Sequence, residues 1–124
     1  AQEALDILLA EDDGRAFRQV AFIDARGGVA VHTGDKCIAD AGNIIGKDYS
    51  VQANMMLNKN VWPAMAEAFE NRSGPLAERM LAALKAAQSA GGDIRGMQSA
   101  AMLIVPVQEQ GSVRDNIITN NRQF

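Results

Sequence analysis

The amino-acid sequence predicts an α+β fold in which helices cover one face of an antiparallel or mixed sheet. Apolar residues repeat with a helical period at the start of the chain and again in its second half. Between these segments apolar and polar residues alternate as in strands, and a Gly-rich turn joins the first two strands. The predicted order is helix, hairpin, strand, two helices and strand, which favours a layered α+β domain.

The first predicted helix begins at residue 1 and ends near Glu11. Its apolar stripe, with the spacing i, i+3, i+4, i+7 and i+8, consists of Ala1, Ala4, Leu5, Leu8 and Leu9. A stripe that starts at the first residue leaves no position for an N-cap side chain. We therefore expect a longer chain whose front part is missing here; the alternative is a frayed native terminus.

Strand patterns follow in the next part of the chain. Residues 20–23 and 29–33 alternate around a turn and predict a hairpin. Residues 34–48 are rich in Gly and Asp and predict a surface loop. Residues 49–55 alternate again and predict a strand with one polar face.

The second half of the chain is predicted to hold two helices and a last strand. The helices cover residues 61–71 and 75–90, the second with Pro inside its start and Gly after its end. Residues 98–105 form a continuous apolar run, which predicts a central strand. The predicted domain therefore spans residues 1–107, and residues 108–124 form a polar tail. With about four strands, we expect the sheet to need missing chain or a second copy, so a homo-oligomer is expected.

Composition excludes several classes of function. The chain has 124 residues and a net charge of −3 with scattered basic residues, which argues against nucleic-acid binding. No run of 18 apolar residues is present, so no membrane span is expected. A single cysteine allows no internal disulfide and favours a reducing compartment such as the cytoplasm. One His and one Cys cannot form a zinc site without several carboxylates, and we expect no metal and no cofactor.

The single histidine and the single cysteine are weak catalytic candidates. No neighbouring serine or carboxylate marks His32 as part of a triad, so a structural role on its strand is favoured. Lys36 precedes Cys37 and would lower the pKa of a reactive thiol. A half-buried loop residue is the favoured alternative for Cys37.

Two segments are better candidates for substrate binding. Gln52 and Asn54 share the polar face of their strand, where two amides can hold a carbonyl or donate to an oxyanion; a solvated strand edge is the alternative. In the Gly-rich loop of residues 90–99, Asp93 and Arg95 can pair or bind an anionic group, and Gln98 enters an apolar strand. The alternative there is a helix end followed by a turn held by an Asp–Arg pair.

These residues resemble the bacterial and archaeal family called domain of unknown function 1028, over about residues 1–105. The resembling segments are residues 18–20 with 24–27, 33–34 with 37, 52–54, 64–65 with 68–69, 75–79, and 90–93 with 95–96 and 98–101. The resemblance implies the αββα sandwich of the N-terminal-nucleophile (Ntn) hydrolases, with this chain as its later part. It also implies a small amide or peptide-like ligand, held by Gln52 or Asn54 and by Arg95 oriented by Asp93.

The chain departs from the family pattern in three ways. Ala53 stands where the family commonly has Gly, and the tail after Pro106 differs. A further N-terminal segment of several strands is absent, and with it the Thr, Ser or Cys that acts as nucleophile. The resemblance thus places any nucleophile outside this chain. A non-catalytic binding or assembly module of the same fold is the rival hypothesis, and a structural half that pairs with a second polypeptide is another.

Overall fold

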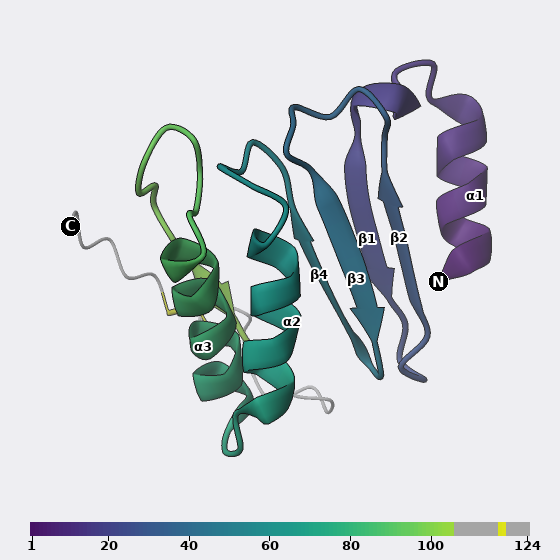
Figure 1. Ribbon diagram of the computed structural model, residues 1–124. Helices are drawn as coiled ribbons and strands as arrows, with labels where there is room; N and C mark the ends of the chain where they lie inside the picture. The colour runs from purple at the N-terminus through teal and green to yellow at the C-terminus, as the bar shows by residue number, and fades with distance from the viewer. Residues whose placement is uncertain (106–116, 119–124) are drawn as a thin grey trace.

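The computed structural model describes residues 1–105 and 117–118, and it is a mixed α+β structure with small antiparallel sheets. Its main part has four layers (Figure 1): one helix, two successive β-hairpins and a pair of helices. Helix α1 (Gln2–Glu11) contacts the first hairpin, and helix α2 (Val61–Asn71) contacts the second. Helices therefore lie on both outer sides of the two stacked hairpins, whereas the sequence predicted helices on only one face of the sheet.

The first hairpin agrees with the sequence pattern. Strands β1 (Gln19–Ile23) and β2 (Val29–Thr33) pair antiparallel, with Gln19 opposite Thr33. The carboxylate of Asp24 accepts the backbone N–H groups of two turn residues, which fixes the connection. Leu5 of α1 is buried against this hairpin, whereas Leu8 is exposed, so the buried stripe of α1 is narrower than predicted.

The predicted surface loop of residues 34–48 is wrong in its second half, because it contains a strand. Strand β3 (Gly42–Gly46) pairs antiparallel with β4 (Tyr49–Ala53) through a two-residue turn. A Cβ on Gly42 would collide with the Trp62 ring, and one on Gly46 with the Tyr49 ring. Both glycines are thus needed where aromatic rings lie directly on the strand.

Helices α2 and α3 (Leu76–Ser89) confirm the predicted helix pair and pack against each other. The Tyr49 and Phe69 rings lie 4.6 Å apart between β4 and α2. Val61 is fully buried at the start of α2. No helix in the part of the chain that the structure describes is long and apolar enough to span a bilayer.

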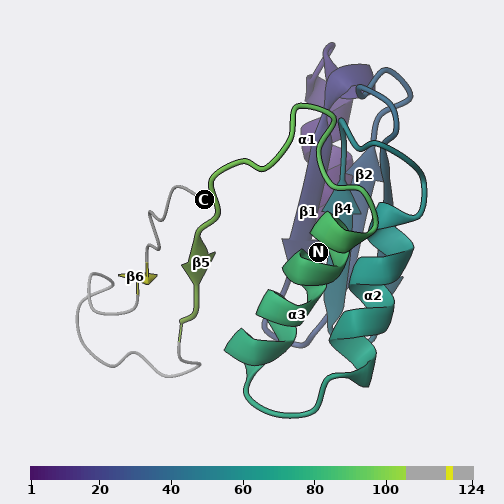
Figure 2. The same ribbon diagram turned by 60° about the vertical axis from the view of Figure 1, so that its left-hand side comes forward.

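The predicted central strand of residues 98–105 is wrong for the described chain. Only β5 (Met102–Leu103) is a strand, and it pairs with β6 (Ile117–Ile118) at a distance from the two hairpins (Figure 2). Leu103 and Val105 are 54% and 60% exposed. The apolar pattern predicted burial, but none of residues 98–105 is buried, and no described strand lies beside this segment on the hairpin side. Pro106 and the predicted boundary at residue 107 fall outside the described residues.

Candidate functional site

A cluster of neutral polar side chains lies between the two hairpins, and Gln19 is at its centre. The Gln19 Nε2 atom donates to Thr33 Oγ1 at 3.1 Å and to the carbonyl oxygens of Gly42 and Ala53 at 3.3 and 3.0 Å. Asn54 Nδ2 donates to Gln19 Oε1 at 3.0 Å. One side chain of β1 thus connects β2 with the ends of β3 and β4.

A second contact continues this cluster across the hairpins. The Thr33 hydroxyl donates to Asn43 Oδ1 at 2.8 Å. Asn43 lies opposite Gln52 in the ladder, and residues directly opposite in a sheet share one face. The alternation of β4 therefore directs Gln52 toward the first hairpin, whereas Val51 and Ala53 are buried on the side of α2. We call Gln19, Thr33, Asn43, Gln52 and Asn54 the inter-hairpin cluster.

Gln52 has the one unpaired buried side-chain polar atom found among the described residues. Its Oε1 is out of contact with solvent and has no hydrogen-bond donor. Such an acceptor costs about 1–3 kcal/mol relative to a satisfied one. The sequence prediction that Gln52 and Asn54 share a polar face is therefore correct, but this face is covered by the first hairpin rather than solvated.

Three backbone segments meet just beyond the end of β4. Met55 N–H donates to the Ile38 carbonyl at 2.8 Å, and Met55 O accepts the Ile94 N–H at 2.9 Å. Met55 itself has a φ of 62°, in the left-handed region that non-glycine residues adopt rarely. Asp93 forms an isolated bridge with Met56. The strand end that holds Asn54 thus lies beside the loop that holds Asp93.

Asp93 and Arg95 form a two-pronged ion pair within that loop. Arg95 Nε and Nη2 donate to the two carboxylate oxygens at 2.9 and 2.7 Å, and the Arg95 backbone N–H donates to Oδ1 at 2.8 Å. The side-chain hydrogen bonds from Arg95 lower the pKa of Asp93 to about 2, and the same pair raises the pKa of Arg95. The structure shows the pairing that the sequence allowed, with the Arg95 side chain more than half exposed.

Gln98 is not brought to the cluster. It is exposed, and its amide donates only to the carbonyls of Gly96 and Met97 at 3.2 Å. Three members of the cluster, Gln19, Thr33 and Asn43, were not predicted from the sequence. Gln19 and Thr33 could have been found from the hairpin register, which sets them opposite each other; Asn43 lay in the segment predicted as a loop.

The side chains of His32 and Cys37 contact the short helical turn η1 (Arg15–Phe17) and the residue that follows it, just before β1. His32 Nε2 lies 2.7 Å from the Arg15 carbonyl oxygen, and Cys37 Sγ donates to the Arg18 carbonyl oxygen at 3.3 Å. Both contacts fit the structural roles favoured from the sequence. Within residues 1–105 and 117–118, no three His, Cys, Asp or Glu side chains gather as a metal site would require.

Comparison with known proteins gives a family and a structural relative. A profile of DUF1028, a family of unknown function, matches residues 1–120. The crystal structure of protein SPO2555 from Silicibacter pomeroyi, itself assigned to DUF1028, shares 36% identity over 73% of this chain with a TM-score of 0.69. The match spans 40% of that longer chain. No curated protein matches the sequence. The chain therefore belongs to the DUF1028 family, whose function is unknown.

Proposed function

We propose that this chain forms the substrate-holding side of an Ntn-hydrolase-like site that cleaves a small amide or peptide-like bond. The nucleophile would lie in the longer polypeptide, outside these residues. The position of Asn54 is the observation that supports this most strongly. Its amide stands at a strand end between two β-layers, held by Gln19, and the described contacts use only one of its two Nδ2 hydrogens.

The second hydrogen of Asn54 Nδ2 is suited to a substrate carbonyl or to the oxyanion that forms during its attack. A fixed amide donor stabilises that developing charge because it needs no reorganisation during the reaction. Gln19 holds the Asn54 side chain in place, because the Gln19 amide is itself bound to one acceptor in each of β2, β3 and β4. The left-handed Met55 then turns the chain away immediately after Asn54.

Arg95 would bind a carboxylate of the substrate. Its Nε and Nη2 atoms bond Asp93, while Nη1 makes no hydrogen bond among the described residues. The guanidinium is therefore oriented by Asp93 and can bind a second anion. The layer order of helix, hairpin, hairpin and helix pair also supports an αββα sandwich as the parent fold.

The test uses the full-length protein and a panel of N-acyl p-nitroanilides with and without a carboxylate. We expect release of p-nitroaniline, and about a 100-fold loss of kcat in Asn54→Ala, the size found when one oxyanion donor is removed. Arg95→Ala should raise KM for carboxylate substrates only. Gln2→Ala, on the exposed side of α1, is the matched control. Unchanged hydrolysis in both Asn54→Ala and Arg95→Ala would contradict the proposal.

A non-catalytic binding module is the second candidate, and one observation favours it. His32 bonds the backbone carbonyl of Arg15 and Cys37 that of Arg18, so the described residues show no nucleophile joined to a base. A β-lactone distinguishes the two candidates. An Ntn nucleophile opens the lactone ring and gains its full mass as an ester or thioester, whereas a binding module keeps its intact mass.

A further inference from the structure

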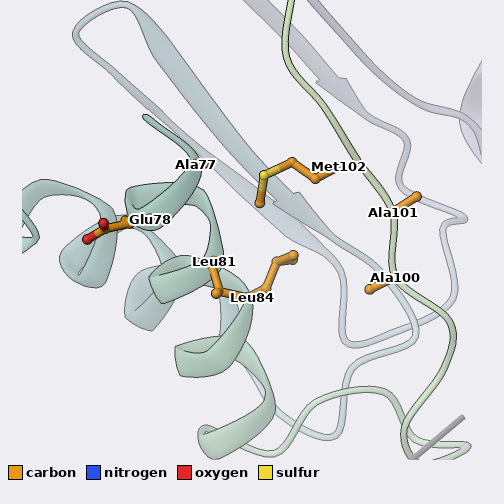
Figure 3. Close-up of a pocket in the computed structure, with 7 residues that line it drawn as sticks. All are labelled: Ala77, Glu78, Leu81, Leu84, Ala100, Ala101 and Met102. Carbon is orange, nitrogen blue, oxygen red and sulfur yellow. The ribbon is translucent and has the colours of Figure 1, made fainter. Parts of the chain in front are cut away.

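Two hollows along α3 are lined mostly by apolar side chains. The larger, of about 620 Å³, lies between β1, β4, α3 and residues 101–105. In the smaller, of about 260 Å³, the Met102 side chain extends toward the helix and the Glu78 carboxylate points away (Figure 3). No Lys, Arg or His is among the described residues that line either hollow. Charged groups that could orient a polar ligand are found instead at one end of the hairpins.

Three loop segments pair with one another at that end. They are residues 38–40, 55–57 and 92–94, from the loops that follow β2, β4 and α3, and Figure 1 shows these loops at the same end of the molecule. Asp40 N–H donates to Met56 O at 3.1 Å, and Met56 N–H donates to Asp40 O at 3.0 Å. Residues that exchange both backbone hydrogen bonds lie directly opposite each other in an antiparallel pair. Asp40 is therefore opposite Met56.

Met56 has a second acidic neighbour on its other side. It forms an antiparallel bridge with Asp93, and the two hydrogen bonds of this bridge, both of 2.9 Å, are made by the adjacent residues. Side chains of such a pair are close, with Cβ atoms about 4.5–5.5 Å apart. Because directly opposite residues share a face, Asp40, Met56 and Asp93 form one row, which we call the loop row. The Arg95 guanidinium lies at its Asp93 end.

The charges of the loop row are not balanced. Asp93 is paired with Arg95, and the Nη1 atom of Arg95 is left without a partner among the described residues. Asp40 is half-buried, and within the described part of the chain its carboxylate takes part in no hydrogen bond or ion pair. The row with its guanidinium therefore has one negative charge in excess, at Asp40.

This charge pattern fits a ligand that has both a carboxylate and an ammonium group. A ligand with a carboxylate alone would satisfy Arg95 but would meet the unpaired charge of Asp40, whereas a zwitterion is complementary to both. Neighbouring strands are about 4.8 Å apart, so the backbones at the two ends of the row are separated by about 10 Å. The two charged groups of an α-amino acid are attached to one carbon, and a hydrogen bond of about 2.9 Å at each end lets them bridge this gap.

We propose that the loop row binds the free α-amino acid end of the substrate. Arg95 Nη1 donates to the α-carboxylate, Asp40 accepts from the α-ammonium group, and the flexible Met56 side chain between them contacts the methylene groups of the ligand.

The position of the cleaved bond follows from this binding mode and rests on the proposed amide hydrolysis. With both α-groups bound, the amide lies in the side chain of the amino acid, near Asn54, which is two residues before Met56 in the chain. Water then cleaves this side-chain amide into a free amine and a second carboxylate. The substrate class is thus an α-amino acid with a side-chain amide, rather than an acylated amino acid, whose nitrogen has no charge.

Isothermal titration calorimetry of the full-length protein measures the binding without any hydrolysis. L-Norleucine has both charges, hexanoate lacks the ammonium group, and L-norleucinamide lacks the carboxylate. L-Norleucine is expected to bind at least about 10-fold more tightly than either, as one charge-assisted hydrogen bond would give. Asp40→Asn keeps the size of the side chain and should weaken L-norleucine about 10-fold while leaving hexanoate unchanged. Asp35→Asn, at an exposed position of the same loop, is the matched control.

A pair of chromogenic substrates tests the position of the cleaved amide. L-γ-Glutamyl-p-nitroanilide and glutaryl-p-nitroanilide share the anilide and one carboxylate, but only the first has an ammonium group. Asp40→Asn should raise KM for the γ-glutamyl substrate about 10-fold with kcat unchanged, and should leave KM for the glutaryl substrate as it is.

Two results would overturn the proposal. One is equal affinity for L-norleucine and hexanoate, and the other is unchanged L-norleucine binding in Asp40→Asn. The outcome is separable from that of the proposed function. L-Norleucine binding that depends on Asp40, without hydrolysis of any anilide, would remove the hydrolase and keep the amino-acid site. Equal hydrolysis of both anilides, with no effect of Asp40→Asn, would keep the hydrolase and remove the amino-acid site.

Discussion

Replacing Gln19 by Met should detach the two hairpins from each other. Methionine keeps the length of the side chain but removes every hydrogen bond of the amide. The two Nε2 hydrogens are shared among three acceptors, and Oε1 accepts one more bond, so about three hydrogen bonds are lost. At roughly 0.5–1.5 kcal/mol each, we expect a loss of about 3 kcal/mol in the free energy of unfolding.

Urea unfolding of the full-length protein, followed by circular dichroism, measures this loss. Gln2→Met is the control, since the Gln2 amide bonds only the exposed Asp6, and it should change stability by less than about 0.5 kcal/mol. In a double-mutant cycle, Asn54→Ala should show a coupling of about 1 kcal/mol with Gln19→Met. A Gln19→Met variant within 1 kcal/mol of the wild type would refute the central place given to this side chain.

Three further predictions concern the core and two ionisable groups. Leu5→Ala should lower the free energy of unfolding by about 2–5 kcal/mol, because Leu5 is 1% exposed, whereas the 52% exposed Leu8 should tolerate the same change in urea unfolding. Arg95→Ala should raise the pKa of Asp93 from about 2 toward 3.8 in an NMR titration. In the wild type, the contribution of ionised Asp93 to the free energy of unfolding is complete above pH 3.8 and is lost as the pH falls toward 2. Burial raises the pKa of Tyr49 to about 12, so its contribution to stability should be complete below pH 10 and fall as the pH rises toward 12. Tyr49→Phe should remove this pH dependence of the free energy of unfolding. If the variant shows the same loss of stability between pH 10 and pH 12 as the wild type, the burial argument is contradicted.

Local sequence patterns were sufficient for the parts of the fold that depend on neighbouring residues. The first hairpin and helices α2 and α3 follow from alternation, helical period and their Pro and Gly signals. Strand β3 could not be predicted in this way. Its glycines at 42 and 46 indicate a loop locally, and only the Trp62 and Tyr49 rings, contributed by other segments, explain why a strand needs them.

In the candidate site, too, local patterns predicted some residues and could not predict others. Alternation was enough to set Gln52 and Asn54 on one polar face, and closeness in sequence was enough to suggest the Asp93–Arg95 pair. Gln19 was missed because its acceptors lie up to 34 residues away, across a layer contact that no local pattern encodes. The apolar run at residues 98–105 was interpreted as central because hydrophobicity indicates burial without naming the covering element.

The groups that join the two hairpins are all neutral. Gln19, Thr33, Asn43 and Asn54 have no charge at any ordinary pH, so neither acid nor added salt weakens their contacts directly. The ion pairs of Arg18 with Asp12, Arg72 with Glu78 and Arg95 with Asp93 all lie at the surface, where ionic strength screens them. High salt should therefore loosen the loops at the periphery while the spacing of the two β-layers, and with it the position of Asn54, stays unchanged.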